Sequence, residues 1–197
     1  MNKNKQEVKI TVRDIVDSND SARVGFAKTY KEVFAEKPYF ENFEIEDIDQ
    51  NVWLPHIGHC IVVVENNFRE VVGFGCAHPF LADTEPSIRD FLVAQKLPFD
   101  SSKTIFMSEL AVRKEFRRQG IGAKIITARL EWGQKNGYTN FCMRTAEHKS
   151  NSRSIYEKIG AKQAPFIQDV SNGKIDTSSK QRVYLWGKIS EALIKLK

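Results

Sequence analysis

The spacing of apolar residues along the first part of the chain predicts a strand, a helix and an irregular segment. Residues 8–12 alternate apolar and polar side chains, which is typical of a strand. Residues 24–34 carry apolar side chains at helical spacing, and Pro38 ends this helix. Residues 39–57 mix aromatic and acidic side chains, and they predict a loop with a short helix.

Two runs rich in β-branched residues predict a hairpin. These runs, 60–65 and 70–77, flank Asn66 and Asn67. Because Asn tolerates the positive φ angles that tight turns require, the two strands are expected to be antiparallel.

The middle of the chain alternates helices and strands. Helical spacing over residues 87–96 is followed by an apolar strand over 104–112 and a long helix from 120 to 137. A strand over 139–145 and a short helix over 152–158 come next. The order strand, helix, strand favours a parallel crossover, so this region predicts one βαβ unit.

The chain is expected to end with two strands around a turn at residues 172–173, the second strand spanning 182–188. Together these elements predict an α/β fold with a mixed sheet and flanking helices. The chain length predicts a single domain over residues 1–197, which is long enough to bury a hydrophobic core.

The composition is that of an ordinary globular protein, with 41% apolar and 28% charged residues. The first residues lack the apolar segment of a secretion signal, and the apolar run at 60–64 is too short to span a bilayer. These features predict a cytoplasmic protein without a membrane partner. Cys60, Cys76 and Cys142 are isolated from one another, which predicts buried free thiols in place of a disulfide framework or a zinc site.

The net charge of +5 is unevenly distributed. Residues 103–135 are mainly basic, whereas residues 36–49 are mainly acidic. A basic region is compatible with nucleic acid or with an anionic cofactor, so the charge alone leaves both open.

A strand, a basic turn, two glycines and a helix follow one another directly over residues 107–132. The turn carries Arg117 and Arg118, and Gly120 and Gly122 open the helix. Unpaired amides at a helix N-terminus, the helix dipole and nearby arginines favour an anion with several oxygens, such as a pyrophosphate. Simple helix capping with close strand packing is the alternative. The motifs of a P-loop and of a dinucleotide-binding fold are not present.

The segment LAVRKEFRRQGIGA resembles the acetyl-CoA-binding motif of the GNAT superfamily of N-acetyltransferases, [QR]-x-x-G-x-[GA], which residues 117–122 match. Downstream, SIYEKIGAK resembles the short helix that presents a tyrosine beside the thioester in this family, here Tyr156. The resemblance is strong over residues 107–162 and follows the strand order of the whole chain.

The resemblance implies a GNAT-like fold, in which a mostly antiparallel twisted sheet contains a splayed pair of parallel strands. It also implies acetyl-CoA as the cofactor, coenzyme A as the product, and a cofactor-binding core over about residues 104–162. The pantetheine arm would pair with the main chain of the strand like an added strand, and amides from the glycine turn would hold the pyrophosphate. The residues implied in cofactor binding are Leu110, Ala111, Val112, Arg117, Arg118, Gln119, Gly120, Ile121, Gly122, Ala123 and Asn151.

Asn151 departs from the family pattern. Relatives carry an asparagine seven residues before the tyrosine, where this chain has Lys149, and Asn151 lies only five residues before Tyr156. Either Asn151 serves from a shortened turn or the contact is absent.

Amide formation from a thioester needs a proton acceptor for the amine and an acid for the departing thiolate. Tyr156 is the candidate acid or hydrogen-bond donor to the sulfur, and a tyrosine that packs its helix on the sheet is the alternative. Glu109 is the candidate base, acting directly or through water, and a structural carboxylate is the alternative. A main-chain amide, that of Leu110 or Ala111, could polarise the thioester carbonyl.

Residues 35–57 form the expected acceptor side, with Tyr39, Phe40 and Glu41 as candidate substrate-binding residues. Acidic and aromatic side chains suit a cationic acceptor such as a polyamine, an aminoglycoside or a peptide amine. A solvated helix face with its caps is the alternative. His56 and His59 resemble a metal-binding pair but lack a second pair of ligands, so no metal site is expected.

The sequence therefore predicts an N-acetyltransferase that moves an acetyl group from acetyl-CoA to a primary amine by direct attack on the thioester. A catalytically inactive acyl-CoA-binding or regulatory module and an acyltransferase for a longer acyl-CoA remain as alternatives. A nucleic-acid partner is not expected, since the basic residues beside the glycine turn fit cofactor phosphates equally well. Exposed final strands would allow a homodimer.

Overall fold

The computed structural model describes residues 8–14, 17–37, 39–82, 86–147, 151–169 and 180–197. In these ranges eight strands form one sheet, in the order β1-β2-β3-β4-β6-β8-β7, and β5 pairs with β3 beside this path. The strands are β1 (Val8–Asp14), β2 (Cys60–Asn66), β3 (Val71–Pro79), β4 (Thr104–Phe106), β5 (Leu110–Val112), β6 (Asn140–Ala146), β7 (Lys162–Asp169) and β8 (Gln181–Lys188).

The sheet is antiparallel except for β4 and β6, which pair in parallel through the long helix between them. The α-helices are α1 (Arg23–Phe34), α2 (Ile45–Ile48), α3 (Pro86–Val93), α4 (Ile121–Lys135), α5 (Asn151–Lys158) and α6 (Ile189–Leu196). This arrangement confirms the predicted α/β class and the central βαβ unit.

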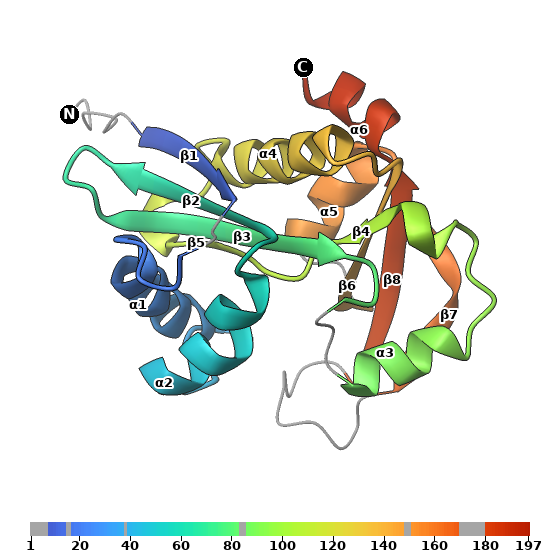
Figure 1. Cartoon of the computed structure of the whole chain (residues 1–197), viewed down its shortest axis with the longest axis horizontal. Helices are drawn as coiled ribbons and strands as arrows, with labels where there is room; N and C mark the ends of the chain where they lie inside the picture. Colours follow the sequence, from blue (N-terminus) through green and yellow to red (C-terminus); the bar gives the residue numbers. More distant parts are fainter. Residues whose placement is uncertain (1–7, 15–16, 38, 83–85, 148–150, 170–179) are drawn as a thin grey trace.

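Helices cover both faces of the sheet (Figure 1). A large cluster packs α4, α5 and α6 against one face, with Ile125, Leu130 and Tyr156 among its members. On the other face α1 and α2 cover the first half of the sheet, and Phe26 and Trp53 are fully buried there. The aromatic cluster under α3 covers the second half of that same face, so the helical cover of this face consists of two separate parts.

The strand predicted over residues 104–112 is interrupted, and this correction matters for function. The Met107 amide donates to the carbonyl of Cys142 at 2.8 Å, which is the end of the pairing with β6. The Ser108 amide then donates to the carbonyl of Cys76 at 3.1 Å, and the Cys76 amide donates to the carbonyl of Glu109 at 3.0 Å. Two residues therefore face one on β3, which makes a bulge. Beyond it, β5 pairs with β3 and with no other described strand.

The hairpin between β2 and β3 is confirmed, but its turn works differently from the prediction. Arg69, and not an asparagine, has the positive φ angle, 62°. Asn66 acts through its side chain, because Oδ1 accepts hydrogen bonds from the amides of Phe68 and Glu70 at 2.9 and 3.1 Å. The side-chain bonds of Asn66 hold the turn, and the residue with a positive φ angle, Arg69, lies two residues before β3 begins at Val71.

Three other sequence expectations have clear outcomes. The segment 39–57 contains the short α2, followed by a π-helical turn (Asp49–Trp53) and a 3-10 turn (Leu54–His56). Helix α6 was not predicted. The turn at 172–173 lies outside the described residues. Within the described ranges, no helix is both long enough and apolar enough to cross a bilayer.

Candidate active site

The N-terminus of α4 forms an open cradle of main-chain amides. Gly120 lies just before the helix with φ 79°, and Arg118 has φ 59°. A Cβ atom at Gly120 would meet nothing within 4 Å, and one at Gly122 would meet only Ile155, at 3.7 Å. The first amides of a helix have no partner within the helix, so they point into this open space. The cradle fits an anionic group that approaches the backbone closely.

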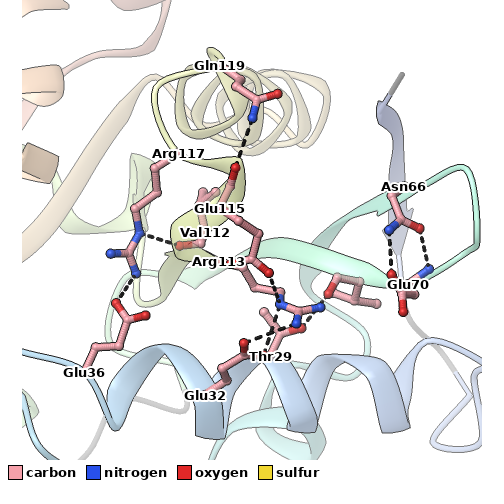
Figure 2. A network of polar contacts seen from close by, with 11 residues as sticks. Thr29, Glu32, Glu36, Asn66, Glu70, Val112, Arg113, Glu115, Arg117 and Gln119 are labelled. Carbon is pink, nitrogen blue, oxygen red and sulfur yellow. Dashed lines mark hydrogen bonds and ion pairs between the residues drawn. The ribbon is translucent and has the colours of Figure 1, made fainter. Parts of the chain in front are cut away.

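Two arginines near the glycine turn, Arg113 and Arg117, form ion pairs with glutamates in and just after helix α1 (Figure 2). Arg117 forms an ion pair with Glu36 at 2.9 Å, and its Nε donates to the carbonyl of Val112 at 2.8 Å. Arg113 forms an ion pair with Glu32 at 3.0 Å. The basic region of the sequence therefore meets one acidic residue of α1, Glu32, and one just after it, Glu36.

The main-chain groups of β5 face two directions. The Cys76 amide donates to the carbonyl of Glu109, and the Arg113 amide donates to the carbonyl of Val72 at 2.9 Å. Directly opposed residues in an antiparallel pair alternate between bonded and non-bonded, so Ala111 bonds with β3 between these two points. Leu110 and Val112 therefore direct their amides and carbonyls to the open edge of β5, away from β3.

Tyr156 of α5 is buried in the cluster that packs α4, α5 and α6 against the sheet. Its hydroxyl accepts a hydrogen bond from Nη2 of Arg129 at 2.8 Å. Burial raises the pKa of this hydroxyl, whereas the charge and hydrogen bond of Arg129 lower it. The phenol therefore stays protonated at neutral pH and has its own proton free to donate.

Glu109 occupies the bulge. Its side chain is partly buried, and burial raises the pKa of its carboxyl to about 7. The charge of Glu41 also raises this pKa, whereas Arg144 and Arg129 lower it. A carboxyl that titrates near neutral pH can accept and release a proton, as general bases do.

The segment that follows α1 lies beside Glu109, as its electrostatic effects on this carboxyl indicate. Tyr30 is buried. Burial is the main cause that raises the pKa of its hydroxyl, and the charges of Glu109 and Glu41 raise this pKa further. Glu41 and Tyr39 are partly buried, whereas Phe40 is 61% exposed with φ 52°. Among the candidate acceptor residues, Glu41 is thus the one that shares its surroundings with the candidate base.

A histidine and a serine form a further polar pair at the bulge. Nδ1 of His56 lies 2.6 Å from the carbonyl of Val52, and Nε2 lies 2.7 Å from the hydroxyl of Ser108. A carbonyl can only accept, so Nδ1 carries the proton and Ser108 donates to Nε2. The ring of His78 lies 5.3 Å from that of His56.

No group of three or more His, Cys, Asp or Glu side chains in the described ranges is placed to hold a metal ion. The three cysteines are buried and form no disulfide with one another, and burial raises the pKa of Cys76 and of Cys142, which keeps both as thiols. Asn151 begins α5, but its side chain and residue Lys149 lie outside the described part of the structure.

Sequence reasoning missed Arg129, which is fully buried and was counted only as part of the basic region. A signal existed in the pattern. Arg129 follows Ile121 and Ile125 at intervals of four residues, so it occupies the apolar stripe of α4 where a charge is costly. His56 was considered only as a metal ligand, and its pairing with Ser108 depends on a contact across 52 positions of the chain.

Comparison with known proteins agrees with this geometry. The model of the acetyltransferase (GNAT) family matches residues 23–161. An N-acetyltransferase from Staphylococcus aureus Mu50 has a similar fold, with a TM-score of 0.65, 14% identity and coverage of 92% of this chain and 99% of that one.

Two other solved structures are similar at the level of the fold. One is YncA from Salmonella typhimurium, solved with its cofactor acetyl-CoA (TM-score 0.63, 11% identity, 92% and 94% covered). The other is the ribosomal-protein-S18-alanine N-acetyltransferase from Escherichia coli (TM-score 0.57, 12% identity, 92% and 94% covered). No curated protein matches the chain significantly in sequence. The family match spans most of the chain, and the chain therefore belongs to the GNAT family of acetyltransferases.

Proposed function

We propose that this protein is an N-acetyltransferase that transfers the acetyl group of acetyl-CoA to the primary amine of a cationic acceptor by direct attack on the thioester. The observation that carries the proposal is the bulge at Ser108 and Glu109. It frees the edge of β5 for an added strand, and it sets a carboxyl that titrates near neutral pH at the start of that edge.

The residues present fit acetyl-CoA. The Leu110 carbonyl and the Val112 amide offer an acceptor and a donor to the pantetheine arm at the open edge, in the manner of β-augmentation. The amides of residues 118–123 offer donors to the pyrophosphate, and the space around Gly120 leaves room for it. Bound there, the cofactor supplies an acetyl group activated as a thioester.

Glu109 and Tyr156 divide the proton transfers. Glu109 accepts a proton from the acceptor ammonium, which leaves a neutral amine that forms the new C–N bond at the acetyl carbon. The Leu110 amide polarises the acetyl carbonyl from the free edge. As the C–S bond breaks and its electron pair moves to sulfur, Tyr156 gives its proton to that sulfur. The second proton of the amine nitrogen then returns to the phenolate, so the phenol is restored.

Two carboxylates and two tyrosines support a cationic acceptor. The charge of Glu41 raises the pKa of the Glu109 carboxyl, and both carboxylates raise the pKa of the buried Tyr30 hydroxyl. Negative charge next to aromatic rings favours an ammonium over a neutral or anionic acceptor. Tyr39, which is partly buried and lies five residues after the end of α1, adds a second aromatic side chain to this segment.

The deciding experiment is a panel of amines with thiol detection of released coenzyme A, using acetyl-CoA and longer acyl-CoA donors in parallel. We expect turnover with polyamines or other dications and none with amino acids that carry a net negative charge. Tyr156→Phe should lower kcat by about tenfold to a hundredfold, because the departing thiolate loses its acid. Binding of acetyl-CoA without turnover of any amine would instead identify a regulatory module. Faster turnover with a longer acyl-CoA would show that the donor is not acetyl-CoA.

A further inference from the structure

We propose that Arg129 is a positioning residue of the acetyl transfer, which fixes the Tyr156 hydroxyl and the main chain of the bulge with a single buried guanidinium. The inference rests on the proposed function, in which Tyr156 donates a proton to the thiolate. It goes beyond that function by assigning a role to a residue of α4 outside the glycine turn.

The contacts of Arg129 converge on the candidate catalytic groups. Nη1 donates to the carbonyl of Glu109 at 2.8 Å and to the carbonyl of Cys76 at 3.2 Å. Nη2 donates to the hydroxyl of Tyr156 at 2.8 Å. One planar group thus connects β3, the bulge and α5, and its fixed fork sets the geometry between them.

Burial makes these contacts costly to replace. Arg129 is 0% exposed, and its Nε is buried without a hydrogen-bond partner in the described structure. A residue chosen for packing alone would be apolar at this position of the stripe, because a buried cation is unfavourable without compensation. The compensation that Arg129 finds is two carbonyls and the Tyr156 hydroxyl, all at the candidate site.

Gly75 makes the placement of the guanidinium possible. A Cβ atom at this position would lie 3.0 Å from Nε of Arg129 and 2.5 Å from Cγ2 of Ile125. The guanidinium therefore lies directly on the backbone of β3, where no other residue type would leave space for it. This close approach brings Nη1 within reach of the Cys76 carbonyl next along the strand.

The hydrogen bond from Arg129 restricts the direction in which Tyr156 can donate its own proton. The hydroxyl accepts from Arg129, so its own proton points away from the guanidinium. The same guanidinium stabilises the phenolate that forms when this proton leaves. Through the Glu109 carbonyl it also holds the residue whose side chain is the candidate base, so the acid and the base are aligned by one group.

The test is a double-mutant cycle of Arg129→Met and Tyr156→Phe in the full chain, with kcat from thiol release and the acetyl-CoA Kd from calorimetry. We expect Arg129→Met to lower kcat by about tenfold to a hundredfold and to change the Kd by less than about threefold. In the Tyr156→Phe background, the same change should lower kcat by a clearly smaller factor, because only the contacts of Arg129 with the bulge are then lost. The control is Lys135→Met, which removes an exposed cation from the last turn of α4 and should leave kcat unchanged.

Equal losses of kcat in both backgrounds would overturn the inference, and so would a loss of acetyl-CoA affinity as large as the loss of kcat. If Arg129→Met does not fold, Arg129→Lys takes its place, since it keeps the cation but lacks the planar fork whose two nitrogens reach the bulge and Tyr156. An intermediate loss of kcat that is smaller in the Tyr156→Phe background is then expected.

A second readout does not depend on turnover. With tyrosine labelled at Cζ with ¹³C, the chain gives signals from five tyrosines, and Tyr156→Phe assigns the relevant one. Arg129→Met should move the Tyr156 signal and leave the signals of Tyr30 and Tyr138 in place. If no amine is acetylated but the Tyr156 signal moves, the proposed function fails while the positioning contact stands. An unmoved signal overturns the contact itself.

Discussion

The Glu109 carboxyl should set the pH dependence of the reaction. Its pKa is raised to about 7 by burial and by Glu41, with Arg144 and Arg129 acting in the opposite direction, and Tyr30 and Cys76 also face it. A base must be deprotonated, so activity rises as pH passes upward through this value. We expect kcat/KM with acetyl-CoA saturating to fall about tenfold for each pH unit below the midpoint.

Variants assign this titration. Glu41→Gln removes a charge that raises the pKa of Glu109, so the acidic limb of the profile should move to lower pH. Glu109→Gln should abolish the acidic limb of the pH profile and lower kcat/KM on its plateau. Glu131→Gln, an exposed carboxylate on α4, is the matched control and should leave the profile unchanged. A limb that persists in Glu109→Gln would transfer the role of base to another group, with the His56–Ser108 pair as the nearest candidate at the bulge.

The sequence pointed to single candidate residues but not to their partners. Glu109 and Tyr156 were identifiable because one precedes and the other follows the glycine turn in a recognisable order. The contact of Arg129 with Tyr156 spans 27 positions, and that of His56 with Ser108 spans 52, so neither follows from local pattern. Such contacts depend on the fold, since they join elements that lie far apart in the sequence.

At the level of elements, the start of α4 offers a matched pair of glycine substitutions. Gly120 has φ 79°, a conformation that costs residues with a side chain about 1–2 kcal/mol. Gly122 is inside the helix, and its Cβ would meet only Ile155 at 3.7 Å. We therefore expect Gly120→Ala to lower the free energy of unfolding by about 1–2 kcal/mol and Gly122→Ala to raise it by about 0.5 kcal/mol.

Urea denaturation of the two variants tests this pair. Gly120→Ala should also weaken the binding of acetyl-CoA, measured by calorimetry, because relief of the strain turns the first amides of α4 away from the cradle. Equal stability of the two variants would mean that the positive φ angle at Gly120 is not required, and the cradle would then need another explanation.

Elements with strong local signals were predicted, and those shaped by pairing were not. Helices α1 and α4 show a clear apolar spacing, and their bounds differ little from the expected ones. The apolar run over 104–112 has no signal for its interruption, because the bulge arises where the strand changes partner from β6 to β3. Helix α6 begins at Ile189, directly after β8 ends at Lys188. The apolar residues of the strand therefore hid the start of the helical spacing.

At the scale of the whole molecule, the parallel pair is where the sheet opens. Strands β4 and β6 pair only over Thr104–Phe106, after which β6 continues with β8 and β5 continues with β3 (Figure 1). The cover of α1 and α2 and the cover of α3 meet the sheet on either side of this opening. An extended ligand that pairs with β5 would therefore bind between the two halves and stabilise both.

Amide exchange followed by ¹⁵N NMR should reveal this pairing residue by residue. In the free protein, the amides of Leu110 and Val112 should exchange faster than that of Ala111, since they face the open edge while Ala111 bonds with β3. Saturating acetyl-CoA should remove this alternation and raise the thermal midpoint, because a ligand at a hundred times its Kd adds about 2.7 kcal/mol to stability. ATP carries phosphates but no pantetheine arm, so the amides of Leu110 and Val112 should still exchange fast in its presence. If these two amides stay fast while calorimetry shows acetyl-CoA to be bound, the arm lies elsewhere and the bulge has no role in holding it.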